Sequence, residues 1–112
     1  MMADTLARLE ATIANRKGAD PAGSYVASLF AKGRGKIARK LGEEAVETIV
    51  AALAEDRQAL TGEAADMLFH LLVLLADADI PLTDVLAELE RREGTSGHDE
   101  KASRSAQSRS GP

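Results

Sequence analysis

The sequence predicts an all-α protein, and three observations lead to that fold class. Apolar residues recur three and four positions apart in several segments, and no useful stretch alternates with a period of two. Capping side chains precede these segments, and glycines follow several of them. The core must consist of small aliphatic side chains, because the 112 residues include one tyrosine, two phenylalanines and no tryptophan. We expect about five helices, two of them long and antiparallel, in a bundle core that homodimerisation completes.

The first two expected helices are the shorter ones at the start of the chain. Asp4 is the expected cap of the first helix, which carries apolar residues on one face and ends at Gly18. Ser24 is the expected cap of the second helix, which ends at Gly33. Tyr25 follows this cap, and we expect its ring in the core rather than as a platform for a nucleobase.

Two long helices occupy the middle of the chain. The glycine-broken stretch "KGRGK" is expected to be a basic loop, and a helix then runs from about Lys36 to Ala54. The segment "AEDR" interrupts the pattern, and Asp56 is the expected cap of a second long helix that reaches about Ala76. The short connection makes the two helices antiparallel neighbours.

The last expected helix follows Pro81 and ends before Gly94. Residues 94–112 contain no leucine, isoleucine, valine, methionine or aromatic residue. Such a segment cannot bury enough apolar surface to offset its chain entropy. We therefore expect an all-α domain over residues 1–93 and a disordered tail over residues 94–112.

Composition excludes several classes of protein. The absence of cysteine removes disulfides, cysteine-bound zinc and thiol catalysis, and it fits a reducing cytoplasm. A net charge of -4 argues against general nucleic-acid binding. The longest apolar run, Met67–Ala76, is shorter than the roughly 20 residues that a bilayer span needs. No sequence resembling a signal peptide opens the chain, so we expect a cytoplasmic protein without membrane contact.

Acidic residues form one strip on each long helix. On the first, one arc of about 100° holds all but one of the charged residues, namely Lys36, Lys40, Glu43, Glu44 and Glu47. The rest of this helix is almost wholly apolar, so we expect it to be buried nearly all round. On the second, a narrow arc holds Glu63, Asp66, His70 and Asp77.

The two strips match in register across the connection. Glu47 and Glu63 are each eight positions from Glu55, and Glu44 and Asp66 are each eleven positions from it. Antiparallel packing therefore places these acids opposite each other, across helices about 8–10 Å apart. Glu43 is expected at the edge of the same group.

Carboxylates so close together must be neutralised by protons or by cations, because like charges and burial both raise their pKa values. Oxygen ligands in a chain without cysteine suit a hard cation such as Mg²⁺, with Mn²⁺ as the alternative. Neighbouring basic residues could hold phosphate oxygens, namely Lys32, Arg34, Lys36, Arg39 and Lys40. Together these groups favour hydrolysis or transfer at phosphorus.

A solvated face balanced by ion pairs one turn apart is the simpler interpretation of the acidic strip. Lys40 and Glu44 would form such a pair. However, Glu47, Glu63 and Asp66 have no basic residue three or four positions away. We therefore favour the metal site.

Three further residues within the long helices have structural explanations. His70 lies one turn beyond Asp66 and is expected to bond to it, as a core or interface histidine that can also orient this acid. Gly42 and Gly62 each cost about 1 kcal/mol against alanine inside a helix, so we expect close helix packing there. Room for a ligand beside the acids is the alternative explanation of the two glycines.

The assembled segments resemble a known family. "GADPAGSYVASLFAKG", "IARKLGEEAVETIVAA", "EAADMLFHLLVLLA" and "LTDVLAELERR" are similar to phosphoribosyl-ATP pyrophosphatases of histidine biosynthesis, from about Leu6 to Arg92. The resemblance implies Mg²⁺-dependent hydrolysis of phosphoribosyl-ATP to phosphoribosyl-AMP and pyrophosphate, in a helical homodimer or higher oligomer. In some organisms this activity is fused behind a cyclohydrolase domain that binds metal through cysteine; with no such domain before residue 1 and no cysteine, we expect the stand-alone form. Phe69 departs from the family, where tyrosine is usual.

The family motif assigns roles to residues of this sequence. Glu44, Glu47, Glu63 and Asp66 match its metal ligands. Glu43 matches the first acid of its E-E-x-x-E pattern, so Glu43, Glu44 and Glu47 are the expected catalytic residues. Lys32 and Lys40 match its lysines and, with Arg39, are expected to bind substrate.

Two other functions stay open from the sequence. The acidic pattern also marks the wider all-α nucleoside-triphosphate pyrophosphatase superfamily, so a housekeeping enzyme of the MazG type is the first alternative. A helical oligomerisation module without catalysis is the second, and it would bind no Mg²⁺.

Overall fold

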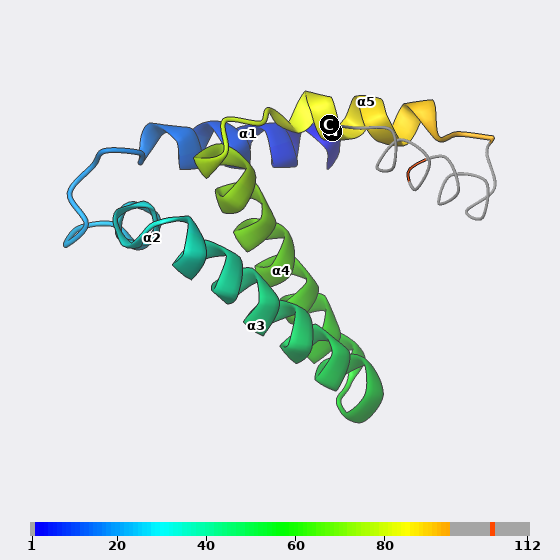
Figure 1. Cartoon of the computed structure of the whole chain (residues 1–112). Coiled ribbons are helices and arrows are strands. Elements are labelled where there is room, and N and C mark those ends of the chain that lie inside the picture. The colour runs from blue at the N-terminus through cyan, green and yellow to red at the C-terminus, as the bar shows by residue number, and fades with distance from the viewer. Residues whose placement is uncertain (1, 95–103, 105–112) are drawn as a thin grey trace. The chain divides into compact units, whose positions relative to one another are not determined.

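The structure is a computed structural model that describes residues 2–94 and residue 104, and those residues form helices without any strand. The all-α prediction is confirmed (Figure 1). In chain order the helices are α1 (Met2–Asn15), α2 (Tyr25–Lys32), α3 (Arg34–Ala54), α4 (Arg57–Asp77) and α5 (Leu82–Arg91).

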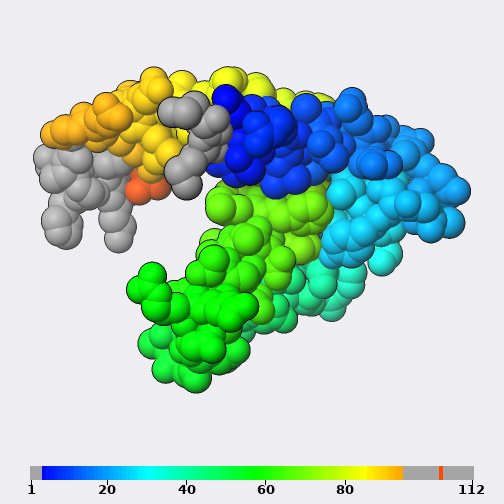
Figure 2. All heavy atoms as spheres, turned by 180° about the vertical axis from the view of Figure 1, so that it is seen from behind, coloured from blue at the N-terminus to red at the C-terminus, as the bar shows by residue number. Residues whose placement is uncertain are grey.

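The hairpin of α3 and α4 is the largest contact between helices in the described part of the chain. Only residues 55 and 56 separate the two helices, so they run antiparallel and side by side, as the sequence predicts. The end of the hairpin that carries this connection projects away from α1 and α2 (Figures 1 and 2). This half of the hairpin therefore receives little cover from the rest of Met1–Leu82.

The core lies at the other end of the hairpin. Each of its five buried side chains adds about 1.5–3 kcal/mol through burial; they are Ile13, Leu29, Ile37, Leu72 and Val73. These residues come from α1, α2, the first turns of α3 and the second half of α4. The core thus fixes the base of the hairpin and leaves its projecting half to be stabilised by α3–α4 packing alone.

Two predicted caps are confirmed. The Ser24 hydroxyl accepts a hydrogen bond from the Ala27 backbone N–H at 3.2 Å, and this starts α2. The Asp56 carboxylate accepts one from the Ala59 backbone N–H at 2.8 Å, and this starts α4. Each cap satisfies a backbone donor that has no partner inside its helix.

Some predicted boundaries are wrong. The first helix already begins at Met2, so Asp4 lies in its first turn instead of capping it. "KGRGK" is not a loop, because Gly33 alone separates α2 from α3 and its φ of +91° reverses the chain there. The early start of α3 has a tertiary cause: the Arg34 guanidinium donates to the Asp77 carboxylate at 2.8 Å and also to its backbone carbonyl.

The expectation that α3 is buried nearly all round is wrong for the chain by itself. Four of its apolar residues, which we call the α3 strip, are largely exposed: Val46 (59%), Ile49 (58%), Val50 (49%) and Leu53 (84%). The predicted close packing at Gly42 and Gly62 is also absent, because a methyl group added at either would meet no atom within 4 Å. Within a single chain, α4 covers only one side of α3.

The chain divides into two compact units, Met1–Leu82 and Thr83–Pro112. In the second unit, Glu88 of α5 binds Arg91 through a salt bridge of 2.6 Å. The predicted tail over residues 94–112 lies outside the described residues, apart from Gly94 and Arg104.

Among the described residues, α4 is long and apolar enough to cross a membrane by length and composition alone. The sequence-based expectation considered only the ten-residue run Met67–Ala76, whereas the helix itself spans Arg57–Asp77. Its main contact within the chain is with α3, so the structure gives this helix a partner in the same molecule.

Candidate metal centre

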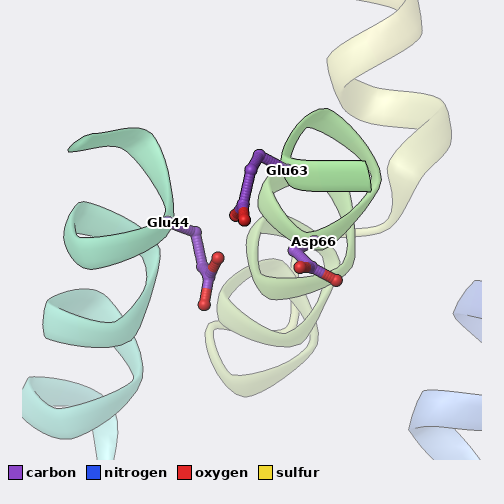
Figure 3. A group of neighbouring side chains, drawn as sticks. All are labelled: Glu44, Glu63 and Asp66. Atoms are coloured by element: carbon purple, nitrogen blue, oxygen red, sulfur yellow. The ribbon is translucent and has the colours of Figure 1, made fainter. Parts of the chain in front are cut away.

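Three carboxylates meet between the two helices of the hairpin. Glu44 comes from α3, and Glu63 and Asp66 come from α4; one carboxylate oxygen of each lies within 4.8 Å of the others. Figure 3 shows the Glu44 and Glu63 side chains reaching toward each other across the gap between the helices. Three of the four acids predicted as metal ligands are therefore neighbours in space.

Glu47, the fourth predicted ligand, borders this group. Its side chain is exposed, and a hydrogen bond with it contributes to the raised pKa of both Glu44 and Glu63. Glu47 therefore lies next to the two central acids, on the solvent side of the cluster. It is one turn along α3 from Glu44, as the helical wheel requires.

Burial makes two of these acids unusual. Glu44 is only 9% exposed, although it carries a carboxylate. The Oε2 atoms of Glu44 and Glu63 are enclosed and have no hydrogen-bond partner in the described part of the chain. A buried polar atom without a partner is destabilising, and a charged one more so. Carboxylate oxygens that lie within 4.8 Å of one another suit a hard cation such as Mg²⁺.

The electrostatics agree with this geometry. Burial raises the pKa of Glu44, and its hydrogen bond and like charge with Glu47 raise it further, against an opposing contribution from His70. Burial likewise raises the pKa of Glu63, again followed by Glu47 and then by the charges of Glu44 and Asp66. Proximity of like charges and desolvation thus act in the same direction on both acids.

Thr48 joins the two helices at the site, and its role is not predicted from the sequence. Its hydroxyl lies 2.7 Å from the Glu44 carbonyl oxygen and 3.2 Å from the Glu63 carbonyl oxygen. A hydroxyl that bonds one turn back along its own helix is common, but the contact to Glu63 ties α3 to α4 beside two acids. The only signal in the sequence is a polar residue that interrupts the apolar part of α3.

The basic residues do not all gather at the acids. Lys40 is half-buried and its Nζ pairs with Glu43 at 3.4 Å, not with Glu44 as the simpler interpretation supposed. The hydrogen bond that Lys40 donates to the Glu43 carboxylate raises the pKa of Lys40, so this amine stays protonated at neutral pH. Lys32 and Arg39 are exposed, and no described contact joins either to the acids.

Arg34, predicted in a loop, lies in the first turn of α3, and Asp77 is the last residue of α4; both lie outside the site. They bind each other at the base of the hairpin, so Asp77 does not join the acids and Arg34 is already engaged. The narrow arc predicted on α4 thus serves two purposes. Its first half, at Glu63 and Asp66, faces α3 at the cluster, and its last residue ends the helix.

His70 is buried and makes two hydrogen bonds. Its Nδ1 lies 2.8 Å from the backbone oxygen of Asp66, so the predicted bond exists but does not involve the Asp66 carboxylate. Its Nε2 lies 3.1 Å from the Tyr25 hydroxyl. Because a carbonyl only accepts, Nδ1 carries a proton, and in the neutral imidazole Nε2 accepts from the tyrosine hydroxyl. The prediction that Tyr25 is a core residue is wrong, since 53% of it is exposed.

Comparison with known proteins identifies relatives over most of the chain. The sequence model of a family described as "Phosphoribosyl-ATP pyrophosphohydrolase" matches residues 6–93. A protein of Rhizorhabdus wittichii named phosphoribosyl-ATP pyrophosphatase is 69% identical over 92% of this chain and 97% of its own length. Proteins of the same name from Novosphingobium aromaticivorans and Zymomonas mobilis are 66% and 57% identical, over 91% and 93% of this chain and 95% and 97% of their own lengths.

Proposed function

Because this chain belongs to the phosphoribosyl-ATP pyrophosphohydrolase family, we propose that it hydrolyses phosphoribosyl-ATP to phosphoribosyl-AMP and pyrophosphate, in the second step of histidine biosynthesis. The observation that carries the proposal beyond the family name is the group of Glu44, Glu63 and Asp66, with two enclosed oxygens that have no partner in the described residues. Only a cation or a proton balances such a group, and a cation there would also attract the anionic phosphates of the substrate.

The four acids Glu44, Glu47, Glu63 and Asp66 would hold Mg²⁺, with Mn²⁺ as the alternative ion. When bound, the ion supplies positive charge to the phosphate oxygens and makes a water molecule more acidic. The role of the protein is to keep the acids in place, which Thr48 does by joining α3 to α4 between Glu44 and Glu63. A site fixed before substrate arrives needs no rearrangement during the reaction.

The remaining site residues act on the substrate and on the water. Lys40 is proposed to bind a phosphate oxygen; its ion pair with Glu43, beside the acids, supports this role. Arg39 and Lys32 are proposed to bind phosphates further out, where both are exposed. Glu43, Glu44 and Glu47 are the proposed catalytic residues: they orient the attacking water and accept the proton that it loses as the bond to pyrophosphate breaks.

Pyrophosphate release is the direct test of this function. The unsubstituted protein should release pyrophosphate from phosphoribosyl-ATP when Mg²⁺ is present, much faster than from ATP or dATP. Glu44→Gln should abolish turnover, since it removes one ligand charge, while the helical content measured by circular dichroism stays the same. Lys17→Gln, at a residue that contacts Ala76 and Asp79 rather than the acids, is the matched control and should retain activity.

Each alternative gives a different result in the same assay. Similar rates with all three nucleotides would indicate a housekeeping pyrophosphatase of the MazG type. No pyrophosphate release, together with no Mg²⁺ binding in calorimetry, would leave a non-catalytic helical module. Full activity in Glu44→Gln would exclude the acidic cluster as the catalytic site.

A homodimer, or a higher oligomer, is the proposed assembly. The α3 strip exposes four apolar side chains, and Leu68 of α4 is 48% exposed. On a helical wheel the strip spans about 100° and borders the arc that holds the acids. Contiguous apolar surface of this kind marks contacts with other proteins, and a second copy would complete the projecting half of the bundle. The contact would then lie beside the catalytic site.

We place this enzyme in the cytoplasm, without a membrane or nucleic-acid partner. The charge of -4 and the absence of cysteine support both points. The apolar length of α4 is accounted for by α3 on one side and by the proposed second copy on the other. The division into a domain over residues 1–93 and a tail over residues 94–112 stays a prediction.

A further inference from the structure

Tyr25 is an exposed aromatic residue whose position is nevertheless fixed. It is 53% exposed, yet its hydroxyl bonds to Nε2 of the buried His70 at 3.1 Å. Its ring stacks on Phe69, with centroids 6.2 Å apart and an interplanar angle of 21°. At the backbone, the Ser24 cap starts α2 immediately before it. An exposed tyrosine that serves only solubility needs none of these contacts.

Tyr25 contacts a histidine that lies one helical turn from the acids. His70, which binds the tyrosine hydroxyl, is one turn along α4 from Asp66, and its Nδ1 bonds to the Asp66 carbonyl. Lys40, one turn along α3 from Glu44, is within electrostatic reach of the phenol, which contributes to its raised pKa. One turn is about 5.4 Å. A ribose spans a similar distance between a nucleobase and its first phosphate.

We propose that Tyr25 is a substrate-binding residue whose exposed ring face stacks on the adenine base while the phosphates of the same molecule lie at the acidic cluster. This inference rests on the proposed function, because it needs a nucleotide whose phosphates occupy that cluster. Two levels of the site then match the two ends of a nucleotide: the Tyr25 ring contacts His70 at one level, and the acids lie one helical turn along the hairpin from it. Stacking on an aromatic side chain accepts any base, so Tyr25 contributes affinity and orientation rather than discrimination between bases.

The ring and the hydroxyl of Tyr25 have different roles in this proposal. The ring supplies the stacking surface, and the hydroxyl bond to His70 holds the ring in place before substrate arrives. Preorganisation of this kind lowers the entropy lost on binding. Loss of the ring should therefore weaken binding strongly, whereas loss of the hydroxyl alone should weaken it slightly.

Steady-state kinetics test the role of the ring. Tyr25→Leu should raise KM for phosphoribosyl-ATP about ten-fold and leave kcat nearly unchanged, because it removes stacking but touches no acid. Tyr25→Phe is the matched variant, since it keeps the ring, and its KM should stay within about three-fold of the unsubstituted protein. A purely structural role would instead lower the melting temperature and kcat in both variants.

A binding measurement gives an independent result without substitution. Tyr25 is the only tyrosine in the chain, so the tyrosine ring signals in a proton NMR spectrum belong to it alone. Titration with AMP should move these signals upfield, as a stacked base does, whereas pyrophosphate, which has no base, should not. Tyrosine signals unmoved by AMP, or an unchanged KM in Tyr25→Leu, would each overturn the proposal. Failure of the proposed function is a separate result: the unsubstituted protein would then release no pyrophosphate.

Discussion

At the scale of single residues, the carboxylates of the acidic cluster serve the proposed function but destabilise the fold. Glu44 is nearly enclosed, and one of its oxygens has no partner in the described part of the chain. A chain selected for stability alone would place glutamine or an apolar residue there. Several carboxylates held together destabilise the metal-free protein. Such a destabilising group is retained in a protein when its function requires it.

The raised pKa values of Glu44 and Glu63 predict how stability depends on pH. Both values exceed the ordinary 4.5, so the folded metal-free protein binds protons more strongly than the unfolded chain. Stability should then fall as pH rises from about 4.5 through the raised folded pKa values, and the fold should gain stability on acidification from pH 7 toward pH 5. Melting temperature, measured with a chelator present across this range, checks the direction.

Glutamine variants show how much of the pH dependence of stability comes from the acidic cluster and how much from the rest of the protein. Glu63→Gln should weaken the rise in melting temperature on acidification, and Glu55→Gln, in the connection between α3 and α4, is the control that should not. Glu88 has the opposite effect on the pH dependence of stability. Its hydrogen bond with Arg91 lowers its pKa from the ordinary 4.5 to about 2, so the stabilisation that it contributes is lost only as the pH falls below about 4.5. A melting temperature that drops steadily from pH 7 to pH 5 would contradict the prediction.

At the scale of secondary structure, local chemistry was predictable and long-range contacts were not. The Ser24 and Asp56 caps could be read from the sequence, because a cap bonds to a backbone donor within a few residues. The early start of α3 could not. Gly35 looks like a second breaker, yet it lies inside the helix, and the contact that supports this first turn joins Arg34 to Asp77, 43 positions away.

Gly62, in the first half of α4, leads to a prediction about the stability of this helix. Gly62→Ala should raise the free energy of unfolding by about 1 kcal/mol, because alanine is the better helix former and the new methyl group meets nothing within 4 Å. Urea denaturation measures the change. Ala65→Gly, at an exposed position on the same helix, is the matched reverse variant and should cost a similar amount. A destabilising Gly62→Ala would mean that a second copy or a substrate packs against that position.

At the scale of the whole molecule, the acidic site was predictable from the sequence. The helical repeat fixes which face of α3 and of α4 carries the acids, and the short connection fixes which residues lie opposite each other. Equal spacing from Glu55 places Glu44 and Asp66 opposite each other, and the structure brings them together with Glu63. Tyr25 was not predictable in the same way. Its contact with His70 depends on how α2 packs on α4, which no pattern within either segment specifies.

The exposure of the α3 strip has the largest consequence at this scale. In a single chain, Leu53 is 84% exposed, so replacing it with lysine should change stability by no more than about 0.5 kcal/mol. In a homodimer that covers the strip, the same change places a charge in an apolar contact, where it is strongly unfavourable. The monomer and the homodimer therefore predict different effects of the same Leu53 substitution: little change in the monomer, and a large loss of stability in the homodimer.

Leu53→Lys should accordingly convert the protein to a monomer or weaken its self-association, as measured by sedimentation equilibrium. The melting temperature of the unsubstituted protein should rise with protein concentration, since association stabilises the fold by mass action, and the variant should lose this dependence. Ala52→Lys, exposed on the same helix but about 110° away from the centre of the strip, is the control and should leave both properties unchanged. If Leu53→Lys keeps the mass and the concentration dependence of the unsubstituted protein, the second copy binds elsewhere, and the projecting half of the hairpin is stable without cover.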